Sequence, residues 1–185
     1  MKRFARKGVF PHQLAFTLLF PLRNIFLSPK ALVKRLELRD DFQVLEVGSG
    51  PGYFSPEIAR NVPRGRLVLA DIQQEMLDCA KKRLDRRGFT DVEYYLCDGE
   101  TFRFPDQVFD RIVMVTVIGE VENQDAYLRE MHRILKSGGI LSISELAGDP
   151  DKLSIGEVRR LSETHGFRLD KLYGSEKNYT INFRK

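Results

Sequence analysis

The chain has 185 residues, a length that suits a single domain. Hydrophobic residues make up 42% of it and charged residues 30%, which is typical of a globular protein and excludes a disordered or fibrous one. Its two cysteines are too few for a disulfide-rich scaffold or a cysteine-based zinc site.

Basic charge is concentrated at the start of the chain. The formal net charge is +4, from 30 Lys and Arg against 26 Asp and Glu. Residues 1–7 contain four of the basic residues and no acidic one, so the charge of the remainder is balanced. A balanced domain argues against a large nucleic-acid footprint.

The basic tail continues into an aromatic, apolar segment. Its apolar run over residues 14–22 is far shorter than the roughly 20 apolar residues that span a bilayer. No small-x-small cleavage site follows, which disfavours a signal peptide. We expect residues 1–29 to pack on the domain or to cover a substrate pocket as a lid. A peripheral membrane contact through residues 1–27 is the alternative.

Helical and strand patterns alternate from residue 30 onward. Ser154 and Glu157 have the spacing of a capping box at the start of the last helix. In chain order, the pattern predicts a helix over 30–38, a strand over 43–50, a helix over 53–62, a strand over 66–71, a helix over 73–87, strands over 92–98 and 109–118, a helix over 123–135 that ends at 137–139, a strand over 140–146, a helix over 154–166, and strands over 167–173 and 178–184.

This alternation predicts an α/β fold with a doubly wound sheet and helices on both faces. The last two strands are joined by a short link that contains Gly174. A parallel crossover needs about a dozen residues or more, so these two strands must pair antiparallel. We therefore expect a mostly parallel seven-stranded sheet with one antiparallel strand near the C-terminus, within a domain over residues 30–185.

The strongest local signal is the glycine loop, which begins at Gly48 and follows the first strand. Glycines there permit a tight turn and a close approach of the backbone to a ligand. Tyr53 stands where a dinucleotide motif needs its third glycine, which disfavours a nicotinamide oxidoreductase. Glu46 precedes the loop by two residues, and its carboxylate would repel phosphate but favour an ammonium or sulfonium group.

Two further acids follow strands. Asp71 ends the second strand, and Asp98, followed by Gly99, ends the third. A carboxylate at Asp71 can accept hydrogen bonds from both hydroxyls of a ribose, and Asp98 can accept one from an adenine amine. Each acid alone is equally well explained as a solvated strand end or a helix cap. Their joint position at the carboxyl ends of strands predicts a ligand site.

At these motifs the chain resembles the class I S-adenosylmethionine-dependent methyltransferases. The resemblance is to the small-molecule branch that contains enzymes of the ubiquinone and menaquinone biosynthesis type, and it covers residues 30–185. It rests on four stretches: VLEVGSGPGYFS, LADIQQEML, YLCDGETFRFPDQVFDRIV and YLREMHRILKSGGILSISE. The resemblance implies a Rossmann-like methyltransferase fold and S-adenosyl-L-methionine as the cofactor.

The resemblance also implies roles for individual residues. The glycine loop would pass under the methionine part of the cofactor, with Glu46 near its amino end. Asp71 would bind the ribose, Asp98 and Gly99 would lie beside the adenine, and residues 115–118 would line the methyl side. The expected cofactor-binding residues are Glu46, Gly48, Ser49, Gly50, Gly52, Asp71, Ile72, Asp98, Gly99 and Val115.

Methyl transfer requires alignment of donor and acceptor, and a general base only where the acceptor must lose a proton. The sequence singles out no such base. His12, Tyr53, Glu120 and Glu145 are candidates, and each has a structural alternative. No histidine or cysteine motif indicates a metal, and we expect none.

Absent motifs narrow the acceptor. The chain lacks the N/D-P-P-aromatic motif of amino-methylating DNA enzymes and the Pro-Cys pair of cytosine-C5 enzymes. We expect a small-molecule or lipid-like acceptor and a cytoplasmic protein, or one peripheral to the membrane. An RNA methyltransferase anchored by the basic tail and a non-catalytic cofactor-binding regulatory module remain open alternatives, and the oligomeric state is not predicted.

Overall fold

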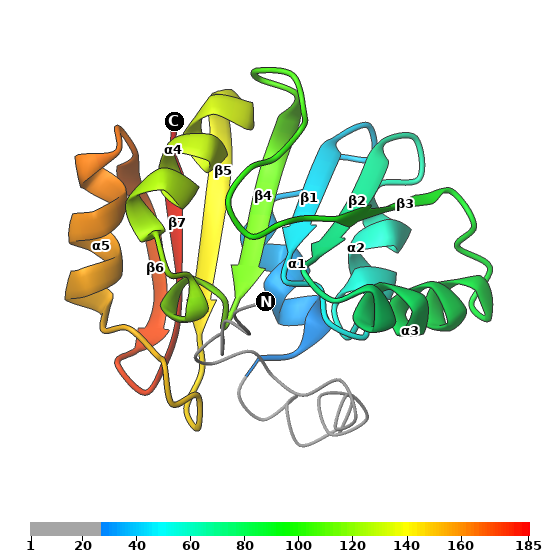
Figure 1. Ribbon diagram of the computed structural model, residues 1–185, viewed down its shortest axis with the longest axis horizontal. Coiled ribbons are helices and arrows are strands. Elements are labelled where there is room, and N and C mark those ends of the chain that lie inside the picture. The colour runs from blue at the N-terminus through cyan, green and yellow to red at the C-terminus, as the bar shows by residue number, and fades with distance from the viewer. Residues whose placement is uncertain (1–26) are drawn as a thin grey trace, which may run out of the picture.

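A seven-stranded sheet lies at the centre of the computed structural model, which describes residues 27–185 (Figure 1). The strands are β1 (Gln43–Val47), β2 (Arg66–Asp71), β3 (Val92–Leu96), β4 (Phe109–Val115), β5 (Leu135–Glu145), β6 (Arg168–Ser175) and β7 (Asn178–Arg184). The helices of the described residues are α1 (Pro29–Leu36), α2 (Ser55–Asn61), α3 (Gln74–Asp85), α4 (Gln124–Ile134) and α5 (Ile155–Thr164), with a 3-10 turn, η3 (Ile118–Glu120).

The strand order is β3-β2-β1-β4-β5-β7-β6. Neighbouring strands run parallel except at β7, which is antiparallel to both β5 and β6. This confirms the predicted doubly wound sheet with one reversed strand. The order reverses between β1 and β4, so the carboxyl ends of these two strands flank the crevice where sheets of this kind bind ligands.

Helices cover both faces of the sheet (Figure 1). On one face, Leu32 of α1 and Ile58 of α2 pack with Val44 and Val113 of the sheet. On the other, Leu128 of α4 packs with the opposite side chains of the same strands, because alternate strand residues point to opposite faces. Each face therefore has its own hydrophobic cluster.

Side-chain caps fix the starts of two helices, one of which was predicted. Ser28 Oγ accepts a hydrogen bond from the Ala31 N–H at 3.1 Å and so caps α1. Ser154 and Glu157 form the predicted capping box at the start of α5, with both reciprocal hydrogen bonds present.

Several predicted strand boundaries are wrong, among them the end of the first strand, which lies at Val47 and not at residue 50. Residues 137–139 do not end a helix but lie within β5, because Gly138 and Gly139 exchange backbone hydrogen bonds with Lys185 at the end of the chain. The strand predicted over 109–118 ends at Val115, because Thr116 has a positive φ of 55° that turns the backbone out of the sheet.

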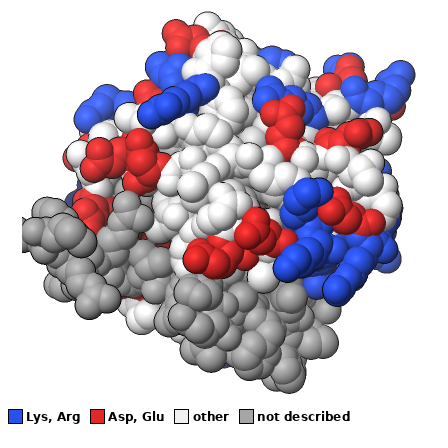
Figure 2. Space-filling model, turned by 45° about the vertical axis from the view of Figure 1, so that its right-hand side comes forward, with Lys and Arg blue, Asp and Glu red and all other residues white. Residues whose placement is uncertain are grey.

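Charged side chains of both signs are interspersed on the face drawn in Figure 2, around an area without charge. No helix within residues 27–185 is long and apolar enough to cross a membrane. The predicted lid or membrane contact falls almost wholly on residues 1–26, which lie outside the described residues, as does His12.

Candidate functional site

The glycine loop connects β1 to α2 at the carboxyl edge of the sheet. Gly48, Gly50 and Gly52 have φ values of 64°, 52° and 73°, a region that other residues rarely adopt. The backbone N–H groups of Gly48 and Ser49 donate to the Ala70 carbonyl at 2.8 and 3.2 Å. These bonds fix the loop against the end of β2.

Close packing explains why two of these positions exclude a side chain. A Cβ at Gly48 would lie 2.4 Å from Val117 Cγ2, far inside van der Waals contact. A Cβ at Gly52 would lie 3.1 Å from Ala80 Cβ on α3. The loop is therefore held between the segment after β4 and the helix after β2.

Asp71 lies at the end of β2, where it contacts the glycine loop directly. Its Oδ2 accepts the Gly50 N–H at 2.8 Å and its Oδ1 accepts the Gln73 N–H at 3.0 Å. The residue is only 7% exposed, and this burial raises the pKa of Asp71 against the opposing effect of the backbone N–H groups. Each oxygen keeps a lone pair that can accept a hydroxyl.

Glu46 points from β1 toward α2 and is 4% exposed. Its Oε2 accepts the Ser55 hydroxyl at 2.6 Å. Burial raises the pKa of Glu46 to about 8, with the Ser55 hydrogen bond lowering it and the charge of Asp71 raising it further. Two buried acids that disfavour each other's ionisation make this a place where a cation is stabilised.

Asp98 binds the turn that follows β3, and its hydrogen bond to an adenine amine stays a prediction. Its Oδ1 accepts the Glu100 and Thr101 N–H groups at 2.9 and 2.8 Å, and its Oδ2 accepts the Thr101 hydroxyl at 2.9 Å. These backbone and side-chain hydrogen bonds lower the pKa of Asp98 to about 2. The carboxylate thus organises the turn after β3, which places Gly99 against Ile72, with a Cβ at Gly99 3.5 Å from Ile72 Cγ2.

The end of β4 reaches the same edge of the sheet. Val115 is half-buried, and the Thr116 N–H donates to the Ser144 carbonyl of β5 at 2.8 Å. A β-branched residue with positive φ is strained, and such strain concentrates at functional sites. Neither Thr116 nor Val117 was singled out as a separate site residue by the sequence, because their role depends on backbone geometry.

The four catalytic candidates do not lie together: Glu145 is buried at the end of β5, away from Tyr53. Glu120 ends η3 near the site and is half-buried, which raises its pKa to about 7, with Asp149, Asp151 and Asp71 contributing. Tyr53 is part of the hydrophobic cluster around α1 and α2. Its ring packs edge-on against that of Phe54, with the ring centroids 4.9 Å apart. His12 lies outside the described residues.

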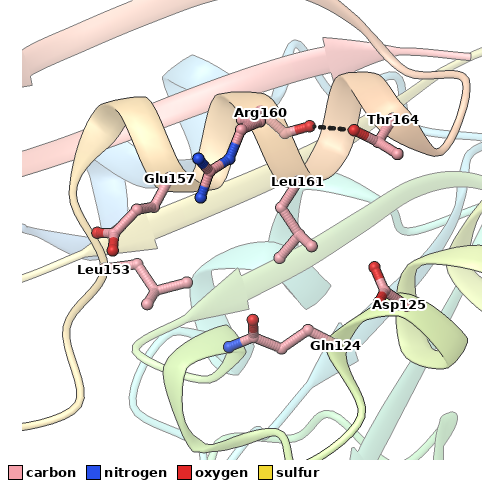
Figure 3. Close-up of a pocket in the computed structure, with 7 residues that line it drawn as sticks. All are labelled: Gln124, Asp125, Leu153, Glu157, Arg160, Leu161 and Thr164. Atoms are coloured by element: carbon pink, nitrogen blue, oxygen red, sulfur yellow. Dashed lines mark hydrogen bonds between the residues drawn. The ribbon is translucent and has the colours of Figure 1, made fainter.

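Two cavities lie away from the predicted cofactor residues. One of about 290 Å³ lies between α4 and α5, where Figure 3 shows Leu161 and Gln124 facing each other. The other, of about 400 Å³, lies beside α1, α2 and α3 and has Tyr53 in its wall. No group of three or more His, Cys, Asp or Glu side chains within residues 27–185 is arranged to hold a metal ion.

The fold and the loop geometry define a Rossmann-like methyltransferase domain, and comparison with known proteins agrees. Residues 45–143 match the family model described as a methyltransferase domain. A solved S-adenosylmethionine-dependent methyltransferase from Aquifex aeolicus superposes with a TM-score of 0.88 at 24% identity, over 95% of this chain and 98% of that one. The chain belongs to the class I S-adenosylmethionine-dependent methyltransferases, whose cofactor is S-adenosyl-L-methionine.

Similar sequences point to one branch of this family. The chain is 31% identical over 139 residues to a ubiquinone/menaquinone biosynthesis C-methyltransferase of Coxiella burnetii, covering 74% of this chain and 54% of that protein. It is 36% identical over 118 residues to the protein of the same description from Pseudomonas putida, covering 63% and 46%. The chain thus spans about half the length of these relatives.

Proposed function

We propose that this chain transfers a methyl group from S-adenosyl-L-methionine to a small-molecule or lipid-like acceptor. The observation that carries the proposal is the contact between Asp71 and the glycine loop, with buried Glu46 beside it. Together they form a confined acidic edge at the switch point of the sheet, and a bound nucleoside that carries positive charge would favour the ionised form of both acids.

The described residues fit this cofactor. The buried Ser49 hydroxyl has no hydrogen-bond partner among the described residues, which leaves it available to a bound polar group. A loop without Cβ atoms at Gly48 and Gly52 would let the methionine part approach the backbone, with Glu46 near its ammonium group. Asp71 would accept the ribose hydroxyls.

The remaining predicted residues would bind the adenine and line the methyl side of the cofactor. Ile72 and Gly99, which lie close together, would form a wall beside the adenine, and Asp98 would support that wall through its turn. Val115 would line the side from which the methyl group leaves. Each of these positions is within a few residues of a strand end, so the sheet itself keeps them in register.

When bound, the cofactor supplies a methyl group already activated by its sulfonium charge. The chain's own contribution is to bind, orient and exclude water, and such positioning can be worth several kcal/mol. The backbone bonds from Gly48 and Ser49 to Ala70 keep the loop rigid, so the site needs little rearrangement. No described side chain has to form a covalent bond to the substrate.

A labelling experiment tests the proposed function. The protein would be incubated with S-adenosylmethionine labelled in its methyl group and with a metabolite extract that contains lipids, and labelled products would be separated. We expect a labelled small molecule with the wild-type chain and none with Gly48→Ala. The proposal fails if the protein binds S-adenosylhomocysteine and yet no labelled product forms, which would favour the non-catalytic binding module.

The basic tail supports one other acceptor, RNA. Residues 1–7 carry four basic side chains, whereas Lys and Arg on the face in Figure 2 are interspersed with Asp and Glu. An RNA-binding enzyme would lose affinity by orders of magnitude between about 50 and 200 mM salt, because counterions are released on binding. A filter-binding titration over that range distinguishes the two acceptors.

A further inference from the structure

Glu145 is a buried acid that the proposed cofactor site does not use. It ends β5 on the same face as Ile143 and pairs across the sheet with Tyr179 of β7. It is 0% exposed, and neither of its carboxylate oxygens has a hydrogen-bond partner among the described residues. A buried carboxylate without a partner is costly, so its retention points to a ligand that satisfies it.

The neighbours of Glu145 do not provide that partner. Asp149 on the loop after β5 and Glu120 at the end of η3 add negative charge, and burial with these charges raises the pKa of Glu145 to about 8. Lys152 acts in the opposite direction, but its Nζ donates to the Glu176 carbonyl. The Tyr179 hydroxyl donates to the Leu153 carbonyl at 2.6 Å. The acids therefore outnumber the cations that face Glu145.

Glu145 also lies close to the proposed methyl side of the site. Ser144 pairs with Val115 in the sheet, and Val115 is the residue proposed for the methyl side, so Glu145 is one residue beyond that pair. The loop after β5 touches η3, since a Cβ at Gly119 would lie 1.9 Å from the Asp151 carbonyl oxygen. Glu120 is near enough to Asp71 to be affected by its charge. The acids thus extend from the proposed ribose contact to Glu145.

We propose that Glu145, together with Glu120, binds the acceptor through a protonated amine, so that the substrates of this enzyme are amines. This rests on the proposed function above. An ammonium group offers three N–H donors to the two unpartnered oxygens and neutralises the cluster, whereas a hydroxyl offers one donor and no charge. The arrangement of these acids does not suit a metal ion.

Methyl transfer to the bound amine requires the loss of one proton from the ammonium group. The ammonium gives one proton to the Glu145 carboxylate, and the neutral amine keeps its lone pair. That pair forms the new N–C bond to the methyl group, and the electron pair of the broken C–S bond stays on sulfur. The product leaves as a methylated ammonium, and Glu145 then returns its proton to solvent.

Binding to the full-length protein saturated with S-adenosylhomocysteine tests the inference. The probes are benzylamine and hexylamine, with benzyl alcohol and hexanol as their uncharged counterparts, each titrated by calorimetry in two buffers of different ionisation enthalpy. We expect the amines to bind at least about tenfold more tightly than the alcohols, as a charge-assisted hydrogen bond would allow. Amine binding near pH 7 should release protons, because the cation lowers the pKa of Glu145.

Three variants test whether Glu145 and Glu120 are the acids that bind the amine. Glu145→Gln should weaken amine binding at least about tenfold and reduce the proton release, and Glu120→Gln should weaken amine binding by a smaller factor. Glu163→Gln, on the exposed face of α5, is the matched control and should change neither. Unchanged binding of S-adenosylhomocysteine shows that each variant is folded.

The experiment distinguishes a failure of the amine inference from a failure of the proposed function. If S-adenosylhomocysteine binds but the alcohols bind as well as the amines, or no amine binds, or Glu145→Gln leaves amine binding unchanged, the inference is wrong and the proposed function stands. If the wild-type protein does not bind S-adenosylhomocysteine, the proposed function fails and the inference fails with it.

Discussion

Replacing Gly48 by alanine tests how tightly the glycine loop is packed, and Gly88→Ala is a matched control. Both glycines have positive φ, 64° and 80°, so each alanine pays a backbone strain of about 1–2 kcal/mol. The two positions differ in the room that they leave for a side chain. A Cβ at Gly48 would lie 2.4 Å from Val117 Cγ2, whereas nothing lies within 4 Å of a Cβ at Gly88. Overpacking of this kind adds about 1–3 kcal/mol.

We therefore expect Gly48→Ala to lower the free energy of unfolding by about 2–5 kcal/mol and Gly88→Ala by about 1–2 kcal/mol. Val117 cannot easily move aside, because a β-branched side chain has few χ1 rotamers. Urea unfolding, with the midpoint compared at constant slope, measures both losses. Equal losses in the two variants would refute the packing argument, and intact S-adenosylhomocysteine binding by Gly48→Ala would refute the role of the loop.

Three further predictions concern the acids and the N-terminal segment. Asp71→Asn should weaken S-adenosylhomocysteine binding by about 1–3 kcal/mol, since an amide oxygen cannot replace two carboxylate oxygens, and unchanged affinity in calorimetry would remove Asp71 from the site. The free energy of unfolding should fall as the pH rises from 4.5 toward about 8, because the pKa values of Glu46 and Glu145 are raised to about 8 and the folded state then binds more protons than the unfolded chain. Glu46→Gln should flatten that slope in urea unfolding, and a slope identical to wild type would contradict the assignment. A chain without residues 1–26 should still bind S-adenosylhomocysteine but lose turnover of the labelled acceptor, and full turnover would exclude the lid.

The sheet could be predicted from the sequence because its signals are local. Apolar runs bounded by turn residues locate the strands, and the short link at Gly174 forces the last two strands to pair antiparallel. The start of β5 could not be predicted, because Gly138 and Gly139 become part of the strand only through hydrogen bonds to Lys185. The end of β4 was missed because no pattern indicates positive φ at a threonine.

The candidate site was predictable to the extent that it follows strand ends. Glu46 and Asp71 come together with the glycine loop because parallel strands end at the same edge. The Ser55 hydrogen bond to Glu46 depends on how α2 turns back over β1, and no spacing rule indicates it. The hydrogen bonds from the turn after β3 to Asp98 could not be predicted from strand positions, although Asp often accepts hydrogen bonds from nearby backbone N–H groups.

Calorimetric titration of residues 1–185 with S-adenosylhomocysteine measures whether the glycine loop forms a cofactor site, with Gly48→Ala and Gly88→Ala measured in parallel. We expect saturable binding of one molecule per chain, lost in Gly48→Ala and kept in Gly88→Ala. The absence of binding heat with the wild-type chain, or equal binding by both variants, would contradict this expectation.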